Sequence, residues 1–174
     1  MRKPVVVTLT LLIALTGGLL AYARRKANPL PTDKPIDRLV VKKSKRVMYV
    51  MSNDEIIKTY RIALGFNPVG HKEYEGDGKT PEGVYTINDR NPNSGYFRNL
   101  GVSYPNDEDK AHARELGKSP GGDIKIHGLK NGYGYIGKLH RQRDWTWGCI
   151  AVTNEEMQEL YDNVPMGTVI EIKE

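Results

Sequence analysis

The stretch that decides the fold is Thr146-Trp147-Gly148-Cys149-Ile150, which holds the single cysteine of the chain. A glycine beside a cysteine lets the backbone approach a bound molecule and turn its N–H groups toward developing negative charge. The polar stretch 141–144 lies just upstream, whereas a structural cysteine usually sits in a continuous apolar run. These features favour a nucleophilic role for Cys149 and leave a buried structural thiol as the alternative.

A nucleophilic cysteine needs a base, because the thiolate is the attacking form. The chain offers four candidates: His71, His112, His127 and His140. His127 follows the predicted strand 124–126 and precedes Gly128, which is a rigid place to hold a base. His140 lies in the loop before the cysteine, and the other two stand in polar surroundings typical of a surface. We therefore predict His127 as the general base.

A lone cysteine excludes an internal disulfide framework and a multi-cysteine zinc site. No His-Glu-x-x-His motif is present, and no carboxylate is spaced to join two histidines around a metal ion. We predict that the protein uses neither a metal nor an organic cofactor.

The positive charge of the chain is concentrated at its start. The 174 residues, about one domain's worth, carry a formal net charge of +5. Residues 1–26 include five basic and no acidic side chains, so the remainder balances 21 basic against 21 acidic residues. The basic pI therefore gives no support to a nucleic-acid partner, and we predict none.

Residues 5–23 form an uncharged apolar run, which as a helix would span roughly 30 Å, the thickness of a bilayer core. Ala21-Tyr22-Ala23 fits a small-x-small cleavage site, whereas the length of the run and the basic residues 24–26 favour retention. We predict that residues 1–26 are a signal peptide or an N-terminal membrane anchor, followed by an extended linker at 27–37. Either alternative places the body in the periplasm or elsewhere in the extracytoplasmic cell envelope.

The body, residues 38–174, is predicted to be mainly β with short helices. Short β-rich runs bounded by turn residues predict strands, at 39–43, 47–51, 55–63, 84–88, 100–104, 124–126 and 168–172. Helices are predicted at 106–116 and 154–161, the second introduced by a capping box of Thr153 and Glu156. The basic cluster 42–46 is interpreted as a solvated turn. The polar stretch 91–121, which includes Tyr104, is expected to form a cleft wall or a surface excursion.

Three motifs in this order resemble the L,D-transpeptidase (YkuD-like) catalytic domain family. They are Thr80-Pro81-Glu82-Gly83-Val84-Tyr85, Ile126-His127-Gly128 and Thr146-Trp147-Gly148-Cys149-Ile150, with Asn154 also at a usual family position. The resemblance covers roughly residues 38–173. It implies a β-sandwich-type fold and peptidoglycan as the substrate.

The resemblance also implies a mechanism. Cys149 would attack the stem-peptide bond after meso-diaminopimelate and pass the acyl group to an amine of another stem peptide, a D-amino acid or a protein lysine. His127 would be the base and the Gly128 carbonyl its orienting partner. The N–H groups of Gly148 and Cys149 would form the oxyanion hole.

Two departures from the family pattern affect the predicted substrate-binding residues. Trp147 and Ala151 stand where many relatives have His and Arg. We therefore consider His140 and Arg141 as replacements. Other positions considered for substrate binding are Thr146, Trp147, Asn154 and Tyr104.

The sequence alone leaves three rival functions open. Water as the acceptor would make the protein an L,D-carboxypeptidase or peptidoglycan hydrolase. A sortase-like transpeptidase would want an arginine after the cysteine, and none follows Cys149. A non-catalytic envelope-binding module would retain the pocket without the chemistry.

Overall fold

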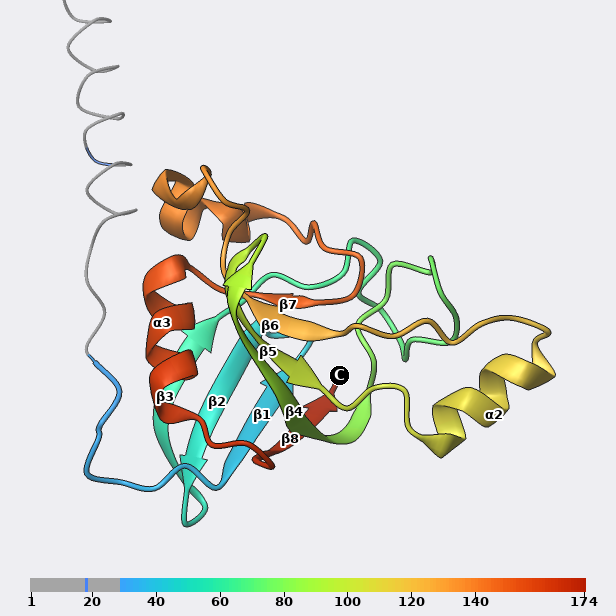
Figure 1. Cartoon of the computed structure of the whole chain (residues 1–174), viewed down its shortest axis with the longest axis horizontal. Coiled ribbons are helices and arrows are strands. Elements are labelled where there is room, and N and C mark those ends of the chain that lie inside the picture. Colours follow the sequence, from blue (N-terminus) through green and yellow to red (C-terminus); the bar gives the residue numbers. More distant parts are fainter. Residues whose placement is uncertain (1–17, 19–28) are drawn as a thin grey trace, which may run out of the picture.

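The computed structural model describes residue 18 and residues 29–174. Eight strands dominate the described chain, so the prediction of a mainly β fold with short helices is confirmed (Figure 1). In order, the elements are β1 (Arg38–Lys42), β2 (Val47–Ser52), β3 (Glu55–Arg61), β4 (Gly83–Ser94), β5 (Phe97–Val102), α2 (Asp107–Glu115), β6 (Lys125–His127), η1 (Gly134–Gln142), β7 (Ile150–Ala151), α3 (Asn154–Asn163) and β8 (Val169–Lys173).

The strands form two sheets joined through β4, with the overall order β3-β2-β1-β8-β4-β5-β6-β7. β1, β2 and β3 make an antiparallel meander. β4 pairs with β8 at its start and with β5 further on, and two register shifts interrupt its pairing with β5. Such bulges bend a strand, which lets β4 turn from one sheet into the other. A bridge between Ala63 and Ala151 connects the chain after β3 to β7, so the outer edges also meet.

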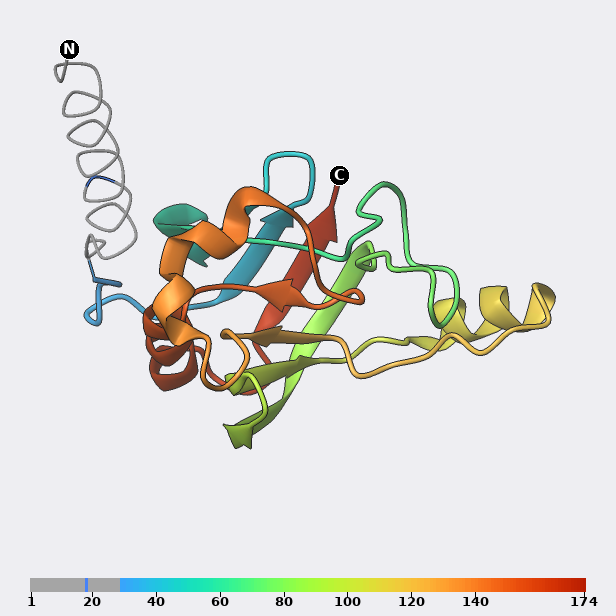
Figure 2. The ribbon, with the colours of Figure 1, turned by 90° about the horizontal axis from the view of Figure 1, so that it is seen from above.

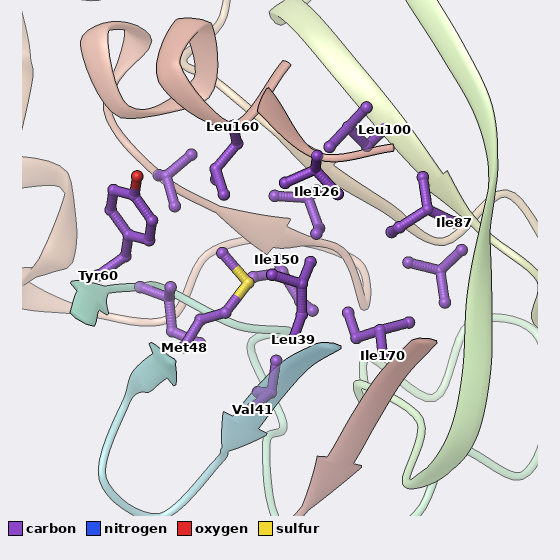
Figure 3. Packing of buried hydrophobic residues seen from close by; sticks show 14 of the residues in the cluster. Leu39, Val41, Met48, Tyr60, Ile87, Leu100, Ile126, Ile150, Leu160 and Ile170 are labelled. Carbon is purple, nitrogen blue, oxygen red and sulfur yellow. The ribbon is translucent and has the colours of Figure 1, made fainter. Parts of the chain in front are cut away.

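The core lies between these layers (Figure 3). Leu39 from β1 and Ile170 from β8 face Ile126 and Ile150 from β6 and β7, and all four side chains are fully buried. α3 closes one side by packing against β5 and β6. Its capping box forms as predicted, because Thr153 accepts from the Glu156 N–H while the Glu156 carboxylate accepts from the Thr153 N–H. The strand that carries His127, β6, is thus held in place by its contacts with α3.

The stretch 91–121 meets the expectation of a cleft wall or a surface excursion only in part, in the segment 106–112 that lines a cavity. Its first part continues the sheet, because β4 runs on to Ser94 and β5 begins at Phe97. Only α2 projects from the body, at the end opposite η1 (Figure 2). η1 itself was not predicted. Its glycines include Gly137, whose φ of +50° interrupts the helix, and such a residue obscures helical periodicity.

The chain is described without a gap from residue 29 onward. The predicted signal or anchor, residues 1–26, lies outside the described residues except for Gly18. Within the predicted linker, Leu30 is buried in the core and its N–H donates to Glu159, so this part packs on the domain. In the described part of the chain, no helix has the length and apolar character to span a membrane.

Lys43 corrects the interpretation of the basic cluster 42–46 as a solvated turn. Its side chain is fully buried, and its ammonium donates to the Thr80 carbonyl at 2.9 Å and to Glu82 at 2.8 Å. Arg46 is also engaged, in an ion pair with Asp144. The buried ammonium ties the turn after β1 to the loop that leads into β4.

Lys43→Met is expected to lower the free energy of unfolding by about 3 kcal/mol, because it leaves a carboxylate and carbonyls without their buried cation. Urea denaturation would measure the change. The matched control is Lys45→Met, which removes an exposed cation from the same turn and should change stability by less than about 0.5 kcal/mol. Equal effects from the two variants would contradict the role assigned to Lys43.

Candidate active site

β6 and β7 bring the predicted nucleophile and base to one face of the sheet. They are parallel, with Ile126 beside Ile150 and His127 beside Ala151. Because side chains alternate along a strand, His127 and Cys149 both point away from the face that buries the two isoleucines. Cys149 immediately precedes β7, so the two groups lie diagonally across neighbouring strands.

The imidazole of His127 is held in one orientation. Its Nδ1–H donates to the Gly128 carbonyl at 2.6 Å, which assigns the proton to Nδ1 and leaves Nε2 as the basic nitrogen. Its ring packs against Tyr96 at 4.8 Å and against Trp145 at 5.7 Å between centroids. The predicted pairing of His127 with the Gly128 carbonyl therefore exists as a contact.

Asn154 positions that carbonyl from the start of α3. Its Oδ1 accepts from the Leu129 N–H at 2.8 Å. A Cβ on Gly128 would lie 2.7 Å from the same oxygen and 3.0 Å from the Phe97 Cβ, so only glycine fits there. The sequence suggests Asn154 as a substrate-binding residue. In the structure, its side-chain oxygen accepts a hydrogen bond from the backbone next to Gly128 and His127.

Cys149 is a partly buried thiol whose Sγ lies 3.6 Å from the Asp123 carbonyl. Burial raises the pKa of this thiol, and the backbone N–H of Lys125 opposes the shift by stabilising the thiolate. Burial also lowers the pKa of His127 to about 4, against the effect of its bond to Gly128. Both groups are therefore neutral near pH 7. The proton must leave the sulfur during attack instead of beforehand.

The loop before the cysteine is fixed by Thr146 and Gly148. The Thr146 hydroxyl donates to the Cys149 carbonyl at 2.7 Å and accepts from the Gly148 N–H at 3.2 Å. The Gly148 N–H, which the sequence predicts as an oxyanion donor, is thus already hydrogen-bonded inside the loop. The Cys149 N–H makes none of the backbone–backbone hydrogen bonds of the described turns and loops. Gly148 has a φ of +131°, and a Cβ there would lie 2.7 Å from the Lys79 carbonyl, so the position requires glycine.

Trp147 and Tyr104 lie in opposite environments. Trp147 is 72% exposed beside the nucleophile and packs edge-on against Phe66 at 4.8 Å. Tyr104 is buried, donates to the Pro120 carbonyl and packs against Tyr85. Tyr104 is therefore a core residue, which corrects its inclusion among substrate-binding candidates.

His140 and Arg141, both from η1, have different surroundings. Arg141 pairs with Glu156 of the α3 capping box, so its charge is compensated and it fastens η1 to α3. His140 is buried and lines a cavity of about 570 Å³ beneath η1. Trp145 contacts the rings of both His140 and His127, which places this cavity next to the base. Sequence reasoning missed Trp145 and Tyr96, since neither belongs to a recognisable motif.

A second cavity, of about 930 Å³, lies at the other end of the molecule against α2. Its charged lining includes His71, His112, Glu73 and Asp109. His71 and His112 are paired with Asp109 and Glu73 respectively. In the described part of the chain, no group of three or more His, Cys, Asp or Glu side chains is placed to hold a metal ion.

Acid is expected to destabilise the site through its two buried histidines. Burial lowers the pKa of His127 to about 4 and that of His140 to about 3, below the ordinary 6.5. The unfolded chain therefore binds more protons below pH 6.5. The contribution of the neutral rings to the free energy of unfolding is complete above pH 6.5. As the pH falls, each histidine loses about 1.4 kcal/mol of this contribution per pH unit, down to about pH 4 for His127 and about pH 3 for His140.

Unfolding free energies at pH 7 and pH 5 test this expectation. The wild type should lose about 4 kcal/mol from the two rings together. His127→Gln should lose about half as much from this source, since only His140 still titrates. An unchanged pH dependence in the variant would show that His127 is not held neutral by burial.

Comparisons with known proteins agree with this geometry. A family model described as "L,D-transpeptidase catalytic domain" matches residues 36–172. The chain is 28% identical over 121 residues to "Putative L,D-transpeptidase YafK" of Escherichia coli K12, covering 67% of this chain and 42% of YafK. It is 26% identical over 144 residues to "Putative L,D-transpeptidase YqjB" of Bacillus subtilis, covering 81% of this chain and 72% of YqjB.

A solved structure is similar along most of the chain. It is the helical cell shape determining protein Pgp2 of Campylobacter jejuni, with a TM-score of 0.60 and 25% identity over 91% of this chain and 55% of Pgp2. The chain thus spans less than half of YafK and about half of Pgp2. The family model covers β1 to β7, including the strands of the candidate site, and all but the last residue of β8. On this evidence, the chain belongs to the L,D-transpeptidase (YkuD) catalytic domain family.

Proposed function

We propose that this protein is a cysteine-dependent peptidoglycan L,D-transpeptidase that cleaves the stem-peptide bond after meso-diaminopimelate. The observation that carries the proposal is the placement of Cys149 and His127 on one face of β6 and β7, with the imidazole fixed by Gly128. Membership of the family supports the same chemistry. The acyl group would be passed to an amine.

In the first step, His127 Nε2 takes the thiol proton as Sγ attacks the carbonyl carbon of the diaminopimelate residue. The Nδ1–H bond to Gly128 stabilises the imidazolium that forms. The Cys149 N–H would donate to the oxyanion of the tetrahedral intermediate. The intermediate collapses when the C–N bond breaks, and His127 returns the proton to the departing D-amino acid.

In the second step, the thioester is attacked by an amine. His127 Nε2 takes a proton from the amine as the new C–N bond forms, and the C–S bond breaks. The leaving thiolate regains a proton from His127. A stem peptide as the acceptor gives a crosslink, a D-amino acid gives exchange, and a protein lysine gives protein attachment. Hydrolysis, with water as the acceptor, would make the protein an L,D-carboxypeptidase.

We place this activity outside the cytoplasm, in the periplasm or cell envelope. Peptidoglycan lies there, and the apolar residues 5–23 are suited to export or anchoring. The similarity to a cell shape determining protein supports a role in cell-wall remodelling.

Intact-protein mass spectrometry with a tetrapeptide-stem muropeptide tests the proposal. We expect a mass increase equal to the muropeptide minus D-alanine. This adduct should disappear faster when an amine is added, together with a new amide product. Loss of the adduct to water alone would identify a hydrolase instead. Absence of any adduct with stem peptides would contradict the proposal and favour a non-catalytic module.

A further inference from the structure

The imidazole of His127 belongs to a cluster of three rings. Its centroid lies 4.8 Å from that of Tyr96 and 5.7 Å from that of Trp145, and the Tyr96 and Trp145 rings stack on each other at 6.2 Å. His127 is only 6% exposed, whereas Tyr96 is 39% exposed and Trp145 is partly exposed. Because both neighbours are more exposed than the imidazole that they contact, they lie between it and solvent.

These contacts add a constraint that the hydrogen bond to Gly128 does not supply. That bond fixes which nitrogen faces the carbonyl, but the ring plane can still rock about a single hydrogen bond. The Tyr96 ring meets the imidazole at an interplanar angle of 53°, and the Trp145 ring meets it at 70°. An imidazole packed against two fixed rings has little room to rotate.

Trp145 is itself held through its main chain and its side chain. Its backbone N–H and that of Thr146 both donate to the Leu64 carbonyl at 3.1 Å. Its indole N–H donates a long hydrogen bond, 3.4 Å, to His140 Nδ1. Nδ1 is the hydrogen-bonded nitrogen of that ring, because Nε2 is buried and has no partner among the described residues. The polar contact of the buried His140 ring is therefore with the residue that packs against the base.

We propose that Trp145 is a positioning residue that holds the His127 imidazole in place and excludes water from it. Tyr96 completes the enclosure, and His140 acts one step further away by fixing the indole. Removing the enclosure admits water to the imidazole, which favours its protonated form and leaves the basic nitrogen in more than one orientation. The inference rests on the proposed function in one respect, since it takes His127 as the base of acylation.

The pH dependence of acylation by a carbapenem, followed by intact mass, tests the role of Trp145. The wild-type rate should fall only near pH 4, because burial lowers the pKa of His127 to about 4. In Trp145→Ala this pKa should rise toward the ordinary 6.5, so the acidic limb should move up by about one pH unit or more. The rate at pH 7 should fall about tenfold, since the base is less well oriented. Circular dichroism at each pH checks that the variant is folded.

Three further variants show whether the effect comes from the enclosure. Trp145→Phe keeps a ring against the imidazole, so its acidic limb should stay near that of the wild type. Tyr96→Ala removes the other ring and should move the limb in the same direction as Trp145→Ala. The matched control is Tyr135→Ala. Tyr135 is 79% exposed on η1 and stacks on Tyr133, so both the rate and the limb should be unchanged.

A double-mutant cycle tests the part assigned to His140. His140→Leu removes the acceptor of the indole N–H and should slow acylation about threefold in the wild-type background. In the Trp145→Phe background it should have no effect, because no indole N–H remains to be fixed. Equal losses in the two backgrounds would contradict the idea that His140 acts through Trp145.

Titration of the His127 ring signals by NMR gives a second readout that needs no acylation. The midpoint should lie near pH 4 in the wild type and higher in Trp145→Ala and Tyr96→Ala. Midpoints and acidic limbs that stay unchanged in both variants overturn this inference and leave the proposed function standing. A wild type that no carbapenem or stem peptide acylates contradicts the proposed function, and the NMR midpoints still decide whether the two rings enclose the imidazole.

Discussion

Replacing Cys149 with serine is expected to abolish the acyl-enzyme and to lower turnover of the stem peptide by about 10⁴-fold or more. Removal of a covalent nucleophile commonly costs this much, because the reaction loses its intermediate. A serine hydroxyl is a far weaker acid than the thiol, and His127, whose pKa is lowered to about 4 by burial, is a weak base for it. Intact mass and product chromatography would measure the two losses.

The exchange of sulfur for oxygen is nearly isosteric, so the melting temperature should change little and serves as the check on folding. An adduct that still forms on the serine variant at another residue would contradict the assignment of Cys149. The variant should retain affinity for the stem peptide, which separates loss of chemistry from loss of binding.

His127→Gln is expected to slow acylation by about 10²-fold or more, since the thiol then has no general base. The rate of acylation by a carbapenem, followed by intact mass, reports this step alone. Because burial lowers the pKa of His127 to about 4, the wild-type rate should fall only as the pH drops toward that value. The variant should lack this limb and approach the wild type at alkaline pH, where the thiolate forms without assistance.

The control for this variant is His112→Gln. That side chain lies on α2, pairs with Glu73 and lines the other cavity, so its loss should change acylation less than twofold. If His140→Gln produced the 10²-fold loss and His127→Gln did not, His140 would be the base.

The sequence signals for the centre of the candidate site are local. Glycine beside cysteine, and histidine at the end of an apolar strand, place Cys149 and His127 without knowledge of distant contacts. The capping box at Thr153 and Glu156 was equally readable. Each of these features depends on residues only a few positions apart.

What the sequence did not show depends on pairings between distant residues. The sequence around Lys43 predicts a solvated side chain, but the loop at residues 80–82 folds against it and accepts its hydrogen bonds. Arg141 looked available, but Glu156 neutralises it from the next helix. The partnerless nitrogen of His140 can be recognised only when all its neighbours are in place.

The position of β8 has a consequence for how the two halves of the molecule depend on each other. β8 lies between β1 and β4, so it joins the meander to the half that carries Cys149. Because both edges of β8 are paired, fraying of this one strand would separate the two halves and open the core between them.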